Sequence, residues 1–411
     1  MLSKKYNPKE SEPKWQSFWQ EKGVYRFDAD SKQPVYSIDT PPPTVNGKIH
    51  IGHIFSYCQA EIMARYKRMK GYNVFYPFGF DDNGLPTERL VEKKYGIKAH
   101  ETTREHFTQM CLDETSALEK QFRTLFTAAG FSCDWNYEYS TISSKAQITS
   151  QKSFIDLYKK KKAYVSNAPA LWCTECQTAI AQAELETAEV PSKFNYLRFY
   201  IDGEDGGFVE IATTRPELLA ACQCIFIHPD DEKNRHLLDK RIQVPLFGFT
   251  VPVFEDEKVE RDKGSGIVMC CTFGDLTDLE WYKKHNLSFQ EAILTDGTMS
   301  DACGKYAGLT VKKAREAIIA DLIEHGHMIR QEDIVHSVAT HERCGTPMEI
   351  TIKKQWFIDI LSNKQAYLEA GDELNWYPPS MKGRYVNWVE NLGWDWCISR
   401  QRYFGVPLRV W

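Results

Sequence analysis

Apolar residues in the first part of the chain follow the spacing of a helix and a short strand. Residues 8–21 are largely polar but carry Trp15 and Trp19 four positions apart, which predicts a short helix. The apolar run at 35–38 predicts a strand, and the prolines at 41–43 end it because proline lacks a backbone donor. The chain therefore enters its first loop directly from a strand.

A longer amphipathic pattern follows this loop. Apolar side chains recur at helical spacing between residues 53 and 70, at Phe55, Cys58, Ile62, Tyr66 and Met69. Charged residues lie opposite them, which predicts an amphipathic helix that ends at Gly71. Residues 73–78 predict a second buried strand, which runs into a loop at 81–84. Strand, loop, helix and strand in this order are typical of a doubly wound α/β fold, whose loops of interest lie at the carboxyl ends of strands.

The pattern changes near Ala163. Helical patterns continue to about Lys162, and short β-like runs with turn signals follow at 196–201, 208–212, 224–228, 243–246 and 266–271. This block ends near Arg330. After it, residues 354–358 and a helical stretch lead back to another apparent strand start at 395–400. We therefore expect a β-rich domain inserted into the α/β fold.

Composition is that of a soluble globular protein of two or three domains. A net charge of −5 gives no overall drive toward nucleic acid, so any RNA contact must come from local patches. The start of the chain lacks a signal peptide's apolar core and no stretch could span a bilayer, so we expect a cytoplasmic protein without a membrane partner. The twelve cysteines should then be reduced thiols, metal ligands or core residues, and Cys222, Cys224, Cys270 and Cys271 favour the core.

Residues 41–53, Pro-Pro-Pro-Thr-Val-Asn-Gly-Lys-Ile-His-Ile-Gly-His, carry the strongest candidate chemistry. A strand exit is followed by two histidines that flank Gly52 where the helix opens. Unpaired N–H groups and the positive end of the dipole at a helix start suit phosphate. His50 and His53 can donate hydrogen bonds to phosphate oxygens whose charge grows in a transition state. Gly52 leaves room for a flat base against the backbone.

In this setting His50-Ile51-Gly52-His53 resembles the first signature of the class I aminoacyl-tRNA synthetases. The resemblance implies a Rossmann-like domain that uses ATP and Mg²⁺ to activate an amino acid as its adenylate and passes it to the terminal adenosine of tRNA. It makes His50 and His53 catalytic and implies an ATP site formed by Pro42, Thr44, Asn46, His50, Gly52 and His53. Positioning and charge stabilisation would carry the catalysis.

The loop Phe78–Glu88 is similar to the amino-acid loop of the valine, isoleucine and leucine branch of that family. By this resemblance Asp81 holds the α-ammonium group, because a carboxylate must oppose a cation in a mostly apolar pocket. Pro43 and Phe404 are expected to wall that pocket, although isoleucine-type enzymes carry Trp in place of Phe404. The Asp-Asp-Asn-Gly sequence is similar to one subgroup of valine enzymes and departs from the commoner bacterial Asp-His-Ala-Gly, whereas isoleucine enzymes carry Asp-Cys-His-Gly.

Rejection of threonine by a valine pocket is difficult because the two amino acids are nearly isosteric, and valine enzymes are themselves the standard example of this problem. A second, hydrolytic site is therefore expected. Ala212–Glu217 resembles the threonine-rich signature of the editing insertion, with Thr213 and Thr214 on the substrate or the attacking water. Arg215 can order the loop or touch the ribose or phosphate.

The segments 263–268 and 271–278 resemble the second half of the same editing pocket. They would contribute Lys263, Thr272, Asp275 and Asp278. Asp278 is the predicted partner of the misacylated ammonium group, with Asp275 as the alternative. Since no nucleophile paired with a base is apparent, positioned water is a better hypothesis than an acyl-enzyme.

Two short pairs of potential metal ligands flank the inserted block. Cys173 and Cys176 form a C-x-x-C pair, and His341 and Cys344 form an H-x-x-C pair. Together they can close a tetrahedral site for structural Zn²⁺ at the base of the inserted domain. His336 is an alternative to His341 with a less usual spacing.

The resemblance predicts activation of valine, its transfer to tRNA(Val) and editing of threonyl-tRNA(Val) by a monomer. The expected segments are 1–165 (first half of the catalytic domain), 166–190 (zinc knuckle), 191–332 (editing domain), 333–394 (return connector) and 395–411 (start of the second half). No Lys-Met-Ser-Lys-Ser signature occurs and the chain stops in an apolar run, so we expect a front part that cannot complete adenylation. An isoleucine enzyme fragment and a stand-alone editing hydrolase or tRNA-binding module remain alternatives, whereas small nucleotidyltransferases are much shorter.

Overall fold

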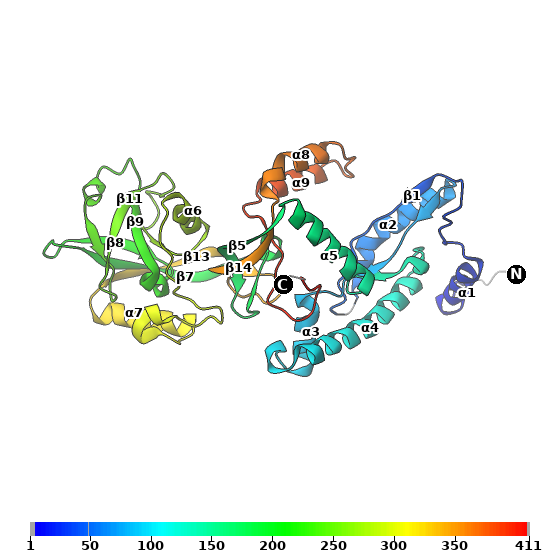
Figure 1. Ribbon diagram of the computed structural model, residues 1–411, viewed down its shortest axis with the longest axis horizontal. Coiled ribbons are helices and arrows are strands. Elements are labelled where there is room, and N and C mark those ends of the chain that lie inside the picture. The colour runs from blue at the N-terminus through cyan, green and yellow to red at the C-terminus, as the bar shows by residue number, and fades with distance from the viewer. Residues whose placement is uncertain (1–4, 48, 409–411) are drawn as a thin grey trace. The chain divides into compact units, whose positions relative to one another are not determined.

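The computed structural model (Figure 1) describes residues 5–47 and 49–408, and the chain forms two compact units. Unit 1 comprises the chain up to Lys159 together with the segment from Arg402, and unit 2 comprises Lys160–Gln401. The expected return of the chain at 395 therefore contributes to unit 1 only from Arg402. Within the described ranges, no helix combines the length and apolarity that a bilayer crossing requires.

Unit 1 is a mixed α/β unit with short parallel strands. Its elements are α1 (Pro8–Lys22), β1 (Val35–Ser37), α2 (Ile51–Met69), β2 (Asn73–Phe75), β3 (Gly79–Phe80), α3 (Leu85–Tyr95), α4 (Arg104–Ala128), β4 (Tyr139–Ser140) and α5 (Ser144–Lys159). β1 pairs in parallel with β2, and α2 connects them, as the strand–helix–strand pattern predicts. β3 pairs in parallel with β4. The strand expected at 73–78 is thus divided, and Pro77 within the gap has no N–H to donate to a ladder.

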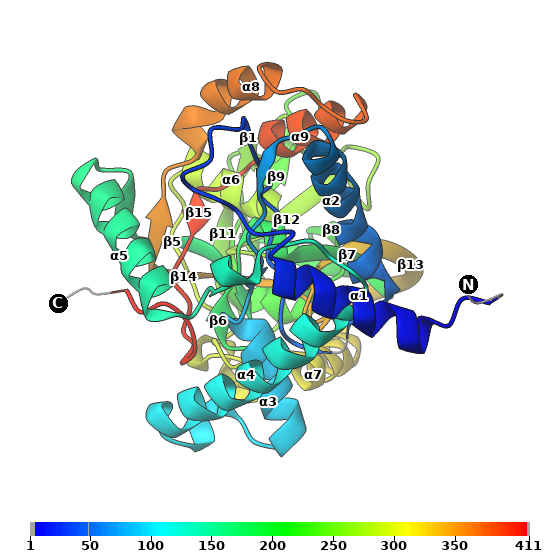
Figure 2. The same ribbon diagram turned by 90° about the vertical axis from the view of Figure 1, so that its right-hand side faces the viewer.

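The core of unit 1 is largely aromatic. α4 contributes Leu118, Phe122 and Phe126 at intervals of four residues, so that they lie on one helix face. They pack against residues of the β2–β3 region that include Phe78 and Phe80. α3 lies beside α4 (Figures 1 and 2), and this contact carries a second cluster around Phe107. Apolar burial at these positions fixes the strands that lead into the predicted nucleotide and amino-acid loops.

The helix α2 does not bury the apolar positions that its sequence pattern singles out. Phe55 is 70% exposed, Ile62 69% and Met69 81%, whereas Glu61 and Ala64 are buried. The Glu61 carboxylate accepts a hydrogen bond from the backbone N–H of Ser132 at 2.8 Å. A buried backbone donor needs such a partner, and this contact turns the Glu61 side of the helix inward.

Unit 2 contains the inserted β block. Its seven-stranded sheet has the order β12-β9-β11-β10-β7-β13, with β8 paired to β7. The elements are β7 (Leu185–Ile201), β8 (Phe208–Thr213), β9 (Cys222–Ile227), β10 (Arg241–Gln243), β11 (Thr250–Glu255), β12 (Ile267–Cys271), α6 (Leu276–Lys284), α7 (Val311–Glu324) and β13 (Met328–His341). Its core includes Ala314, Ile318 and Leu322 of α7, again four residues apart.

Two long strands carry the chain into and out of this block. β7 and β13 pair antiparallel from Leu197 opposite Met328 to Leu185 opposite His341 (Figure 1). The expected segment boundaries at 190/191 and 332/333 lie inside these continuous strands. A ladder has no break at such a point because each residue pair supports the next.

The remaining part of unit 2 is a four-stranded sheet with two helices. The sheet has the order β15-β14-β5-β6. The elements are β5 (Ala163–Cys173), β6 (Thr178–Ala179), β14 (Glu349–Ile358), α8 (Lys364–Asp372), α9 (Met381–Glu390) and β15 (Trp396–Cys397). β14 begins with Glu349 opposite Trp172, the residue before Cys173. The sheet therefore lies directly beside the predicted metal ligands.

Candidate functional site

The two histidines of the predicted nucleotide site lie together at the start of α2. His50 is the N-cap, and its Nδ1 accepts a hydrogen bond from the Gly52 N–H at 3.2 Å. The His53 Nδ1 accepts one from the His50 N–H at 3.3 Å. The two ring centroids are 4.2 Å apart. The helix start thus uses both imidazoles to satisfy N–H groups that would otherwise lack partners.

These contacts determine the protonation of the rings. A ring nitrogen that accepts a hydrogen bond carries no proton, so the proton of each neutral imidazole must lie on Nε2. Burial and the neighbouring His50 lower the pKa of His53, which favours its neutral form. The His53 ring can therefore offer an Nε2–H donor to a phosphate oxygen without a charge of its own.

Gly52 lies close against the His50 ring. A Cβ at that position would come within 3.0 Å of the His50 ring atoms Cε1 and Nδ1. Besides the expected room for a base, there is thus a second reason for glycine at position 52: a larger residue would crowd the His50 ring.

The predicted ATP loop and the predicted amino-acid loop are joined by backbone hydrogen bonds. The Asp81 N–H donates to the Pro43 carbonyl, and the Val45 N–H donates to the Asp81 carbonyl, both at 2.9 Å. Thr44 and Asp81 form an isolated parallel bridge. The Asp81 carboxylate accepts hydrogen bonds from the hydroxyls of Thr44 at 3.4 Å and Thr141 at 3.2 Å. Pro43, Thr44 and Asp81 are thus neighbours, whereas Pro42 and Asn46 are half-buried in the same loop.

Asp82, the residue after Asp81, forms a carboxyl pair with Glu119. Asp82 is fully buried and accepts a hydrogen bond from the Ser140 hydroxyl. Glu119 of α4 lies beside it, and burial together with Asp82 raises the pKa of Glu119 to about 7. Burial also raises the pKa of Asp82. Two adjacent buried carboxylates repel each other when both are ionised, so the pair retains a proton near neutral pH.

Phe404 is held by a glutamate that sequence reasoning did not select. Glu88 of α3 is fully buried and accepts hydrogen bonds from the N–H groups of Tyr403 at 2.8 Å and Phe404 at 2.5 Å. It also pairs with the Arg402 guanidinium. The Phe404 side chain packs with Phe107 in the α3–α4 cluster. Its burial is therefore explained by that cluster, and a role in the amino-acid pocket stays a prediction.

The threonine-rich segment follows β8 and is locally ordered. The Thr213 hydroxyl accepts a hydrogen bond from the Arg215 N–H at 3.0 Å, and the Thr213 carbonyl accepts one from the Asn195 side chain at 3.1 Å. Thr214 is half-buried next to it. The Arg215 guanidinium donates to the Gly274 carbonyl at 3.3 Å. This contact brings the two predicted halves of the editing pocket together.

Asp278 lies at the base of the second half. Its Oδ2 accepts a hydrogen bond from the Gly274 N–H at 2.7 Å, and its own N–H donates to Asp275, the N-cap of α6, at 3.0 Å. Burial and the Asp275 charge raise the pKa of Asp278 to about 8. A buried carboxyl with a raised pKa gains most from a cation, which is the environment expected for an ammonium partner.

The other predicted editing residues differ in position. The Thr272 hydroxyl is buried and exchanges hydrogen bonds with the Gln290 backbone at 3.1 and 3.2 Å. The Lys263 side chain is 63% exposed and pairs with Glu260. Its loop nevertheless lies near the pocket, because a Cβ on Gly264 would come within 2.9 Å of the Ala212 Cβ. The Lys263 side chain therefore lies on the surface, and only the backbone of its loop lies near the predicted pocket.

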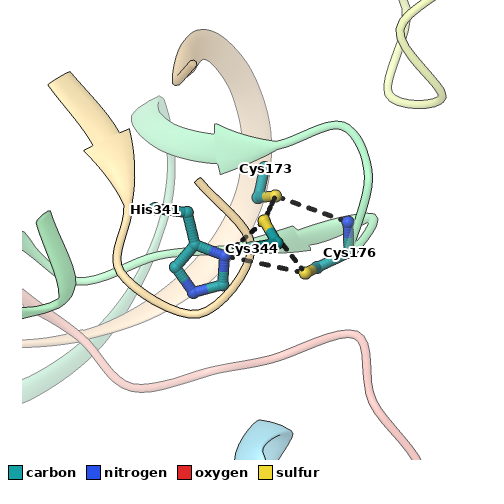
Figure 3. A group of neighbouring side chains, drawn as sticks. All are labelled: Cys173, Cys176, His341 and Cys344. Atoms are coloured by element: carbon teal, nitrogen blue, oxygen red, sulfur yellow. Dashed lines mark hydrogen bonds between the residues drawn. The ribbon is translucent and has the colours of Figure 1, made fainter. Parts of the chain in front are cut away.

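The four predicted metal ligands converge in unit 2 (Figure 3). The Sγ atoms of Cys173, Cys176 and Cys344 and the His341 ring nitrogen all lie within 4.8 Å of one another. Cys173 and Cys344 are 3.5 Å apart at sulfur, and the His341 Nδ1 lies 3.3 Å from the Cys344 sulfur. Hydrogen bonding, first from Cys176, lowers the pKa of the Cys173 thiol to about 3. Three soft thiolates and one imidazole in a buried group fit a tetrahedral ion such as Zn²⁺.

Tertiary pairing explains why these ligands meet. Cys173 ends β5, and His341 ends β13, which is paired with β7. His336, the alternative ligand, lies opposite Val190 within the β7–β13 ladder and outside the group of four. His341 is therefore the fourth member of the cluster.

Comparison with known proteins gives consistent results. A sequence profile of the family "tRNA synthetases class I (I, L, M and V)" matches residues 14–411. "Valine--tRNA ligase" of Rickettsia prowazekii (strain Madrid E) is 50% identical over 410 residues, which cover 99% of this chain and 50% of that protein. The protein of the same name from Rickettsia rickettsii (strain Sheila Smith) is 49% identical with the same coverage. The chain spans about half the length of the curated relatives it matches.

A solved structure is also similar. The "Crystal structure of the ternary complex of Agrobacterium radiobacter K84 agnB2 LeuRS-tRNA-LeuAMS" covers 98% of this chain and 51% of its own, with 19% identity and a TM-score of 0.44.

Proposed function

The chain belongs to the class I tRNA synthetases of the isoleucine, leucine, methionine and valine group, and we propose that it serves the ligation of valine to tRNA(Val). The observation that carries this proposal is the 50% identity, over 99% of the chain, to a protein named valine–tRNA ligase. The Asp-Asp-Asn-Gly loop at 81–84 agrees with this specificity and favours valine over isoleucine.

We propose that unit 1 binds ATP and valine. The Nε2–H groups of His50 and His53 would donate to phosphate oxygens, and the N-terminus of α2 would add its dipole. Mg²⁺, which this family uses with ATP, would balance the phosphate charge. Asp81 would bind the valine ammonium group, and its short connection to Pro43 and Val45 would fix the distance between amino acid and phosphate.

We propose that the β block of unit 2 hydrolyses threonyl-tRNA(Val). Asp278 would bind the ammonium group of the misplaced threonine, and Thr213 and Thr214 would bind the ester or orient a water molecule. The contact from Arg215 to Gly274 supports this proposal because it joins the two loops that carry these residues. We further propose that Cys173, Cys176, His341 and Cys344 bind one structural Zn²⁺.

Ligand binding tests the synthetic half of this proposal. Calorimetric titration of the chain with a non-hydrolysable valyl-adenylate analogue should show binding, and Asp81→Asn should weaken it about 10- to 100-fold, because the ammonium group would lose a charged partner. The isoleucyl analogue should bind more weakly than the valyl analogue. Tighter binding of the isoleucyl analogue would contradict valine specificity, and equal binding by Asp81→Asn would contradict the role of Asp81.

Deacylation tests the editing half. The chain should release threonine from threonyl-tRNA(Val) faster than buffer alone, and valyl-tRNA(Val) should be spared. Hydrolysis no faster than in buffer would count against an editing site in this chain.

A further inference from the structure

We propose that Glu349, which lies outside the inserted β block, is a positioning residue of the predicted editing site and acts through Arg215. This inference rests on the proposed editing function. It assigns a role to a residue on β14, the strand that follows the Cys/His cluster.

The first step is the pairing of Glu349 with Arg215. The Arg215 Nη2 donates to both carboxylate oxygens of Glu349 at 2.8 Å. Both bonds leave one nitrogen and anchor that end of the guanidinium, while its Nε and Nη1 are held by Glu217 and the Gly274 carbonyl, so the three contacts together fix its plane. The partners are 134 residues apart in the chain. Arg215 directly follows Thr213 and Thr214. It is therefore held both by Glu349 on the four-stranded sheet and by residues of the β block that contains it.

The second step is charge balance. Arg215 also donates to Glu217 at 3.1 Å, and Glu217, which is fully buried, accepts two hydrogen bonds from Arg315 of α7 at 2.7 and 2.8 Å. The two arginines and two glutamates form a neutral group. Although burial opposes its charge, Glu349 and Glu217 raise the pKa of Arg215. Without Glu349, two guanidinium groups would share the single carboxylate of Glu217, which is unfavourable because Glu217 is fully buried.

The third step leads from Arg215 to Asp278. Arg215 Nη1 donates to the Gly274 carbonyl at 3.3 Å, and the N–H of the same Gly274 donates to Asp278 at 2.7 Å. The space around Gly274 is tight, because a Cβ there would come within 2.6 Å of the Asp278 carboxylate. A displacement of Arg215 would therefore move the Gly274 peptide against the group that is expected to bind the substrate ammonium.

Kinetics of the whole chain test this inference. Glu349→Gln keeps the shape of the side chain but removes its charge. We expect KM for threonyl-tRNA(Val) to rise about tenfold, with kcat changed less than about threefold. The reason is that binding of the substrate ammonium group by Asp278 is weakened, whereas the position of the attacking water is unchanged. Glu349→Asp, which retains the charge on a shorter arm, should recover part of the loss.

Glu291→Gln is the matched control. Glu291 contacts the same strand through Thr351 at 3.1 Å and Lys353 at 3.8 Å, so its loss tests the general effect of removing a carboxylate beside β14. We expect it to leave KM within about twofold, in the range of a weak surface pair. A double variant, Arg215→Lys with Glu349→Gln, should be no worse than Arg215→Lys alone, because both changes act on one connection.

Three results would overturn the inference. These are an unchanged KM in Glu349→Gln, an equal effect of Glu291→Gln, and additive effects in the double variant. If the unaltered chain does not deacylate at all, the editing proposal itself fails. The positioning role is then still measured by hydrogen exchange, because Glu349→Gln should speed exchange of the Gly274 amide and Glu291→Gln should not.

Discussion

Replacement of Glu88 by alanine should strongly destabilise unit 1. Glu88→Ala would leave the N–H groups of Tyr403 and Phe404 without their acceptor, and Arg402 would lose its pairing with Glu88 while keeping the contact with Glu92 at 3.1 Å. The Arg402 side chain is only 11% exposed, so water cannot readily replace the missing charge. Breaking one side of such a buried pair costs about 3–5 kcal/mol.

This magnitude converts into a measurable shift. For a unit of about 170 residues, 1 kcal/mol corresponds to roughly 2–4 °C, so the unit 1 transition should fall by about 6–20 °C. Thermal unfolding followed by circular dichroism measures it. Hydrogen exchange assigns the effect, because the amides of Tyr403 and Phe404 should lose protection.

Glu114→Gln provides the control for the same unit. Glu114 pairs with Lys94 at 2.6 Å, but Lys94 is half exposed, so its loss should lower stability only slightly, as for an exposed ion pair. If Glu88→Ala melted within about 2 °C of Glu114→Gln, the buried pair would contribute no more than a surface pair. The reasoning from burial would then be wrong.

Three further predictions concern the metal cluster and two titrating carboxyls. The purified chain should contain about one zinc per molecule by elemental analysis, and Cys176→Ser should lower both zinc content and melting temperature; a zinc-free chain of unchanged stability would contradict the site. Asp278→Asn should raise KM for threonyl-tRNA(Val) deacylation at least as much as Glu349→Gln does, because it removes the charged partner of the substrate ammonium group. It should also flatten the pH dependence of unit 2 stability, because a folded pKa raised to about 8 means stability is lost as the pH rises from about 4 to 8; a slope like that of the unaltered chain would refute this. Unit 1 should likewise lose stability as the pH rises from about 4.5 to 7, since burial and Asp82 raise the pKa of Glu119 to about 7, and Glu119→Gln should reduce this loss. Denaturant titrations at several pH values measure it, and an unchanged pH dependence in the variant would contradict the prediction.

Local features of the candidate sites could be predicted from the sequence. Two histidines around one glycine after a strand exit specify a helix start with its N–H groups satisfied by the rings, and all the atoms involved lie within four residues. The C-x-x-C and H-x-x-C spacings each bring two ligands within reach through a single turn. Family membership, the mixed α/β class and α1 follow from equally local patterns and are confirmed.

The contacts that join distant segments could not be predicted in this way. Hydrophobic periodicity shows which face of α2 is apolar. The face that turns inward is instead the one that carries Glu61, whose hydrogen-bond partner Ser132 lies 71 residues away in the chain. Glu88 holds Phe404 across 316 residues, and Glu349 holds Arg215 across 134. None of these pairs leaves a spacing signal, because their proximity depends on the whole path of the intervening chain. The sequence therefore determined the chemistry available at each loop, and only the tertiary structure decided which buried charges neutralise one another and hold those loops in place.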